Sequence, residues 1–103
     1  MNSEDLEIIA SIARVNKDGF DPENNSDQLI ALMKKLHIGI SPPCYGSHRY
    51  AAEIYVQNTE DNLSHRCEYY RERDTFEEAV LATALAYSIH KRRSDDNEMY
   101  LGT

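Results

Sequence analysis

The sequence predicts a single α+β domain in which two to three helices pack on a three-stranded antiparallel sheet, in the order α-α-β-β-β-α. Apolar residues recur at three- and four-residue steps in three segments, which is the pattern of amphipathic helices. Three other segments alternate between apolar and polar residues, and their short polar connections favour antiparallel pairing. The expected helices are residues 3–15, 27–36 and 75–93, and the expected strands are residues 37–41, 49–57 and 63–71.

The two N-terminal helices are predicted from their caps and apolar stripes. Ser3 and Ser26 each stand where a side-chain oxygen can accept from a free backbone N–H of the first turn. The first helix is expected to end before the turn residues Asn16 to Gly19, and the second at Leu36, with lysines in its last turn.

The last helix is expected to begin at a cap formed by Asp74 or Thr75, because Glu78 follows Thr75 at capping-box spacing. Its apolar face is wide and rich in alanine, so we expect it to be buried on more than one side. Three bases at 91–93 mark its predicted end. We therefore place the domain at residues 1–93, followed by a flexible acidic tail at 94–103.

Alternation within the strands assigns side chains to two faces of the sheet. In the segment 49–57 the core face is expected to carry Tyr50, Ala52, Ile54 and Val56. Alternation along 63–71 places His65, Cys67 and Tyr69 on one face and leaves the other to Arg66, Glu68 and Tyr70.

The formal net charge of −7 is unevenly distributed along the chain. Residues 1–27 hold seven acids and two bases, residues 28–93 hold eight acids and nine bases, and residues 94–103 hold three acids and no base. The N-terminal acids form either a solvated face or a patch that docks on a basic protein surface. The candidate partner-binding acids are Glu4, Asp5, Glu7, Asp18, Asp21 and Glu23.

Composition also limits the compartment and the partners. The N-terminus carries acids where a signal peptide needs bases, no apolar run approaches the ~20 residues of a membrane span, and there are only two cysteines. We therefore expect a cytoplasmic protein in a reducing compartment, with no membrane partner. Phosphate-backbone binding relies on lysine and arginine, so the acidic balance argues against direct nucleic-acid binding.

Two cysteines and two histidines form the only candidate metal set. Cys44, His48, His65 and Cys67 would suit zinc if the loop before the second strand folded over the third. The alternatives are a Cys44–Cys67 disulfide, or a buried Cys67 beside a hydrogen-bonded His65. No orienting third residue accompanies either cysteine and no glycine-rich phosphate loop is present, so we expect neither an enzyme nor a cofactor.

Seven tyrosines and no tryptophan make up most of the aromatic set. Tyr55 and Tyr70 are expected on the sheet face that also carries Glu53, where they would form a partner or homodimer interface, or lie half-buried under another helix. The arginines of the sheet region suggest nucleic-acid contact with tyrosine stacking, but interspersed glutamates would neutralise such a groove. Those arginines are Arg49, Arg66, Arg71 and Arg73, and the glutamates are Glu53, Glu68 and Glu72.

Two local patterns resemble a family of small tailed-phage proteins, the alpha-beta-alpha sandwich domain of NinX-like proteins. The first is Gly19-Phe20-Asp21-Pro22-x-Asn24-Asn25, followed by a helix and by Ile38-x-Ile40. The second is Asp74-Thr75-x-Glu77-x-Ala79, followed by an alanine-rich helix. The resemblance covers residues 19–93 and implies a sandwich fold and a phage or prophage setting, without catalytic residues.

These observations lead to one functional expectation. We expect a small acidic phage or prophage accessory protein that acts by non-enzymatic protein binding. Its sharpest form is an inhibitor of a host defence complex, anti-CRISPR-like or otherwise anti-defence, that occupies a basic nucleic-acid-binding surface. The alternative is a zinc-stabilised or nucleic-acid-contacting module built on the cysteine and histidine set.

Overall fold

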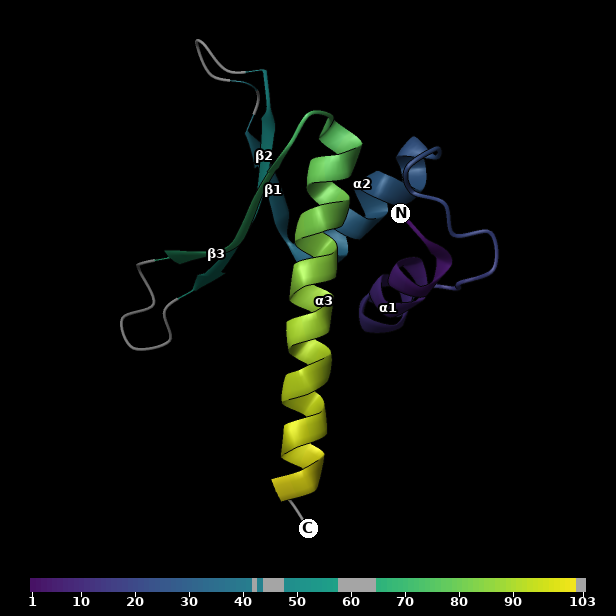
Figure 1. Cartoon of the computed structure of the whole chain (residues 1–103), viewed down its shortest axis with the longest axis vertical. Coiled ribbons are helices and arrows are strands. Elements are labelled where there is room, and N and C mark those ends of the chain that lie inside the picture. The colour runs from purple at the N-terminus through teal and green to yellow at the C-terminus, as the bar shows by residue number, and fades with distance from the viewer. Residues whose placement is uncertain (42, 44–47, 58–64, 102–103) are drawn as a thin grey trace.

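Three helices and three strands follow one another in the predicted order (Figure 1). The structure is a computed structural model, and it describes residues 1–41, 43, 48–57 and 65–101. The prediction of an α+β fold with a three-stranded antiparallel sheet is confirmed. The elements are α1 (Ser3–Ala13), α2 (Ser26–Leu36), β1 (Ile38–Ser41), β2 (Tyr50–Gln57), β3 (His65–Arg73) and α3 (Phe76–Leu101).

The central strand of the sheet is β2, which pairs antiparallel with β1 on one side and β3 on the other. Alternation predicts the β1–β2 pairing well, since Ile38 lies opposite Ile54 and both are buried. Between β2 and β3 the register shifts after Ala52, and Tyr69 adopts a left-handed backbone with φ of 59°. Bulged residues break the alternation of a strand.

The expectation of one uninterrupted alternation along β3 is therefore wrong. In the shifted register Cys67 lies opposite Tyr55 and Glu68 opposite Ile54, whereas alternation had grouped Glu68 with Tyr55. Tyr69 itself packs against α3, where its ring meets Tyr87 edge-on at a centroid distance of 5.5 Å. That aromatic contact helps to offset the cost of a positive φ in a bulky residue.

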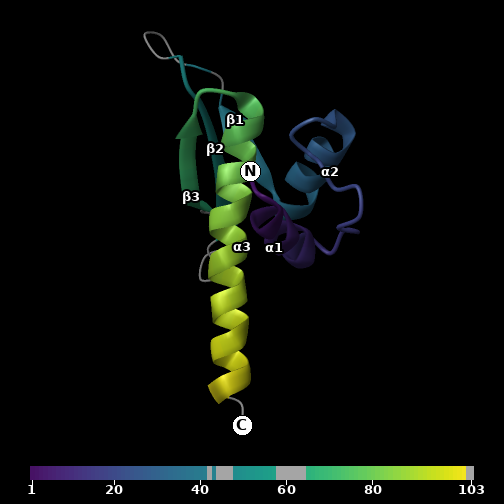
Figure 2. The ribbon, with the colours of Figure 1, turned by 45° about the vertical axis from the view of Figure 1, so that its right-hand side comes forward.

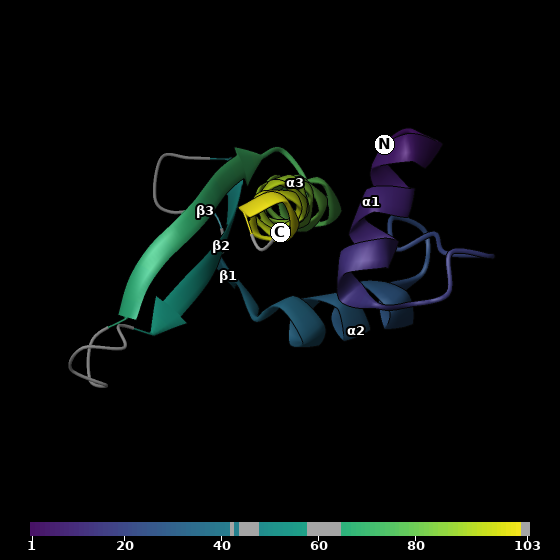
Figure 3. The same cartoon turned by 90° about the horizontal axis from the view of Figure 1, so that it is seen from below.

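The long helix α3 is the centre of the molecule. Viewed along its axis, it lies between the sheet on one side and α1 with α2 on the other (Figure 3). On the sheet side, the buried hydroxyl of Thr83 donates to the carbonyl oxygen of Ala52 at 2.9 Å. Ala79 and Ala84 are fully buried, which lets the neighbouring elements approach closely. The prediction that this helix is buried on more than one side is confirmed.

The helix ends differ from prediction in detail. The caps of α1 and α2 are Asn2 and Asn25, one residue before the predicted serines, and the Asn2 side chain accepts from the backbone N–H of Asp5 at 2.9 Å. Thr75 accepts from the backbone N–H of Glu78 at 3.2 Å, as its spacing predicts. Asparagine caps as well as serine does, so the residue type alone could not choose between neighbours.

The predicted end of the last helix at residues 91–93 is wrong, because α3 continues to Leu101. No glycine or proline occurs between Thr75 and Gly102, so nothing in the sequence stops the helix at the three bases. The C-terminal part of α3 extends beyond the sheet and α1 (Figures 1 and 2).

All three helices lie on the same side of the sheet (Figure 3). In the part of the chain that the structure describes, no helix covers the opposite face. The two-sided cover that a sandwich fold implies is therefore not what these elements form. Among the described residues, no helix combines the length and the apolar character needed to cross a membrane.

Candidate functional site

The predicted partner-binding acids divide into two groups around α1. Four exposed acids form what we call the α1 surface, on α1 and on the loop that follows it: Glu4, Glu7, Asp18 and Asp21. Glu7 and Asp18 come together at a hollow beside Phe20, and Glu4 and Glu7 line a second hollow between α1 and α3. The other two, Asp5 and Glu23, instead line a groove on a different side of α1.

The α1 surface carries four carboxylates, and Lys17 and Arg92 line the hollows beside them. Among the described residues, none of its four carboxylates forms an ion pair with a lysine or arginine. Asp21 accepts from the side-chain amide of Asn24 at 3.0 and 3.2 Å, which fixes the loop and leaves the negative charge in place. Such exposed charges contribute little to stability, so they are free to act on another molecule.

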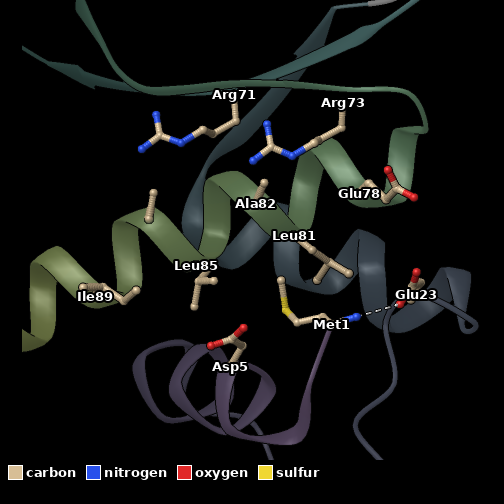
Figure 4. Close-up of a pocket in the computed structure, with 11 residues that line it drawn as sticks. Met1, Asp5, Glu23, Arg71, Arg73, Glu78, Leu81, Ala82, Leu85 and Ile89 are labelled. Carbon is tan, nitrogen blue, oxygen red and sulfur yellow. Dashed lines mark ion pairs between the residues drawn. The ribbon is translucent and has the colours of Figure 1, made fainter.

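The groove lies between the edge of β3 and the start of α1, with α3 as its floor (Figure 4). Its volume is about 560 Å³, within the usual range of small-ligand sites. Arg71 and Arg73 form one wall, and Met1 and Asp5 form the other. The floor consists of five apolar side chains of α3, namely Leu81, Ala82, Leu85, Ala86 and Ile89.

The two arginines are held in place by the strand that carries them. Arg71 donates to the carbonyl oxygen of Tyr70 at 2.7 Å, and Arg73 donates to that of Glu72 at 2.6 Å. Neither arginine has a carboxylate partner among the described residues. Each guanidinium has five N–H donors, so most of them remain for a ligand.

The predicted tyrosine site lies elsewhere. Tyr70 is 47% exposed, and its hydroxyl donates to the carboxylate of Glu72 at 2.5 Å. Glu53 lies opposite Gly39 on β1 and is half-buried. The side chain of Tyr55 lies outside the described residues.

Tyr70 and the α1 surface belong to layers on opposite sides of α3 (Figure 3). The structure therefore does not combine the predicted acids and tyrosines into one continuous surface. The reason is that α3 and the groove separate the sheet from α1. The local sequence pattern of neither region predicts this separation.

The cysteine and histidine set falls largely outside the described residues. Cys44 is not described, the side chains of His65 and Cys67 are not described, and His48 is exposed. Among the side chains that are described, no group of three or more His, Cys, Asp or Glu residues could hold a metal ion. The zinc alternative therefore stays a prediction.

Comparisons with known proteins identify no relative. No protein-family model matches the chain, and neither the curated proteins nor the solved structures contain a match. The resemblance to NinX-like phage proteins thus stays a prediction carried by its two short patterns.

Sequence reasoning considered Arg71 and Arg73 only as contacts to nucleic acid and did not associate them with α3. Their spacing of two residues in a strand places both on one face. Extending the predicted strand from Arg71 to Arg73 would have revealed this pair. The apolar floor could not be predicted in this way, because the same apolar residues are equally typical of a buried helix face.

Proposed function

We propose that the protein acts without catalysis, by docking its α1 surface on a basic surface of a larger protein. The observation that carries this proposal is the set of exposed carboxylates at Glu4, Glu7, Asp18 and Asp21 with no basic partner among the described residues. Charge of this kind attracts a complementary surface over several ångströms and speeds encounter. The adjoining hollows beside Phe20 and Ile12 offer apolar contact once the two surfaces meet.

In its sharpest form the partner is a host complex whose basic surface normally binds nucleic acid. An acidic protein that occupies such a surface competes with phosphate for the same lysines and arginines. The resemblance to phage proteins supports an inhibitor of host defence, because that resemblance implies a phage or prophage setting. This form of the proposal depends on the resemblance, whereas docking by the α1 surface does not.

The test is affinity purification from host extract with two double variants alongside the natural chain. Glu7→Lys with Asp18→Lys reverses two charges of the α1 surface that cap no helix. Asp74→Lys with Glu77→Lys changes the net charge equally at the start of α3. We expect the first variant to lose the partner and the second to keep it. Equal capture by both variants would contradict the proposal.

A further inference from the structure

The groove over α3 differs from the α1 surface in having charges of both signs on facing walls. Arg71 and Arg73 lie along the β3 wall, and Asp5 lies across the α3 helix from them (Figure 4). Asp5 is half-buried and has no cationic partner among the described residues. The remaining carboxylate on that side, Glu23, is engaged by the Met1 ammonium at 3.6 Å.

The two walls favour opposite charges on one ligand. Glu78 lies at the Arg73 end of the groove, and Asp5 lies across the floor from Arg71 (Figure 4). A guanidinium with free donors is suited to bind a carboxylate with two parallel hydrogen bonds. A simple anion would gain this contact but would leave the Asp5 carboxylate without a cation. A ligand that also carries an ammonium group would pair with the arginines on one wall and with Asp5 on the other.

The floor determines the chemical character of the middle of the ligand and the length of the ligand. Ala82, Leu85 and Ile89 are half-buried, so apolar surface remains open between the walls. The walls flank a helix, whose diameter with side chains is about 10 Å. An extended peptide spans about 3.3–3.6 Å per residue, so about three residues reach from one wall to the other.

We propose that the groove binds a short aliphatic peptide with free termini, its carboxylate on Arg71 and Arg73, its ammonium on Asp5 and its side chains on the α3 floor. This site is independent of the docking proposed for the α1 surface. It would give the protein a small-molecule ligand, and the ligand would bridge β3 and α1 across α3.

The experiment titrates the full chain with the tripeptide Leu-Ala-Leu and follows amide chemical shifts by NMR. Three blocked forms, N-acetylated, C-amidated and doubly blocked, are titrated in parallel. The protein variants are Arg71→Gln and Asp5→Asn, with Lys34→Gln and Asp27→Asn as matched controls on α2. A charge-assisted hydrogen bond contributes enough that its loss weakens binding by about tenfold or more.

We expect saturable shifts on β3, α3 and α1 with the free tripeptide. Amidation should weaken binding to the natural chain more than binding to Arg71→Gln, which keeps Arg73. Acetylation should weaken binding to the natural chain but not to Asp5→Asn. Both control variants should bind as the natural chain does. The absence of saturable shifts would overturn the proposal, and so would equal binding of the doubly blocked peptide, which would indicate an internal segment of a protein as the ligand.

Discussion

The α1 surface and the groove both border α1, yet they distribute charge in opposite ways. On the α1 surface, the carboxylates of Glu4, Glu7, Asp18 and Asp21 face solvent, and none of them forms an ion pair with a base among the described residues. In the groove, Asp5 faces Arg71 and Arg73 across an apolar floor. An uncompensated field acts at a distance on a large partner, whereas separated opposite charges select a small ligand that carries both. Under the two proposals, α1 would border both a docking surface and a ligand site.

The largest expected effect comes from loosening the packing on which both regions depend. Ile9 of α1 is 0% exposed in the core, whereas Ile30 of α2 is 48% exposed. We expect Ile9→Ala to lower the free energy of unfolding by about 2–5 kcal/mol, since a cavity adds to the lost apolar burial. Urea denaturation should show a far smaller loss for Ile30→Ala. Equal losses would mean that α1 is not packed as described.

Variants of the α1 surface and variants of the groove should each affect only one of the two binding activities. Glu7→Lys with Asp18→Lys should leave Leu-Ala-Leu binding unchanged, because neither side chain lines the groove. Asp5→Asn should weaken binding of that peptide by about tenfold and should change docking on a macromolecule much less. NMR titration measures the first quantity and surface plasmon resonance against the purified partner measures the second. If either variant impaired both activities to the same degree, the two regions would be a single site.

Two buried hydroxyls of α3 allow a smaller test of the helix itself. Thr83 donates to Ala52, whereas the fully buried hydroxyl of Ser88 has no hydrogen-bond partner among the residues that the structure describes. A buried polar group without a partner costs about 1–3 kcal/mol. We therefore expect Ser88→Ala to raise the unfolding free energy by about 1 kcal/mol. Thermal unfolding is the measurement, and a clear fall in stability would show that the hydroxyl has a partner.

An effect of about the same size concerns the start of α1, next to both regions. Because Asn2 accepts from the N–H of Asp5, Asn2→Ala should cost about 1 kcal/mol of stability. Ser3→Ala should cost little, although the sequence suggested Ser3 as the cap. Chemical denaturation of the two variants compares them directly, and a larger loss for Ser3→Ala would contradict the structure.

The order of elements could be predicted because each helix and strand carries its own periodic pattern. The antiparallel pairing of β1 with β2 could be predicted from their short connection and alternation, but the shift near Ala52 could not, since a bulge adds one residue without changing composition. The end of α3 was missed because basic residues favour a helix end without requiring one. The groove was missed because it depends on the distance between β3 and α1, a tertiary property.

We expect the α1 surface to dock by charge on a basic partner. The most direct measurement is the association rate constant with the purified partner at several salt concentrations, for the natural chain and for Glu7→Lys with Asp18→Lys. We predict a rate constant that falls steeply with salt for the natural chain, and a lower, flatter dependence for the variant. Identical rate constants and salt dependence for the two proteins would contradict docking of the α1 surface by charge.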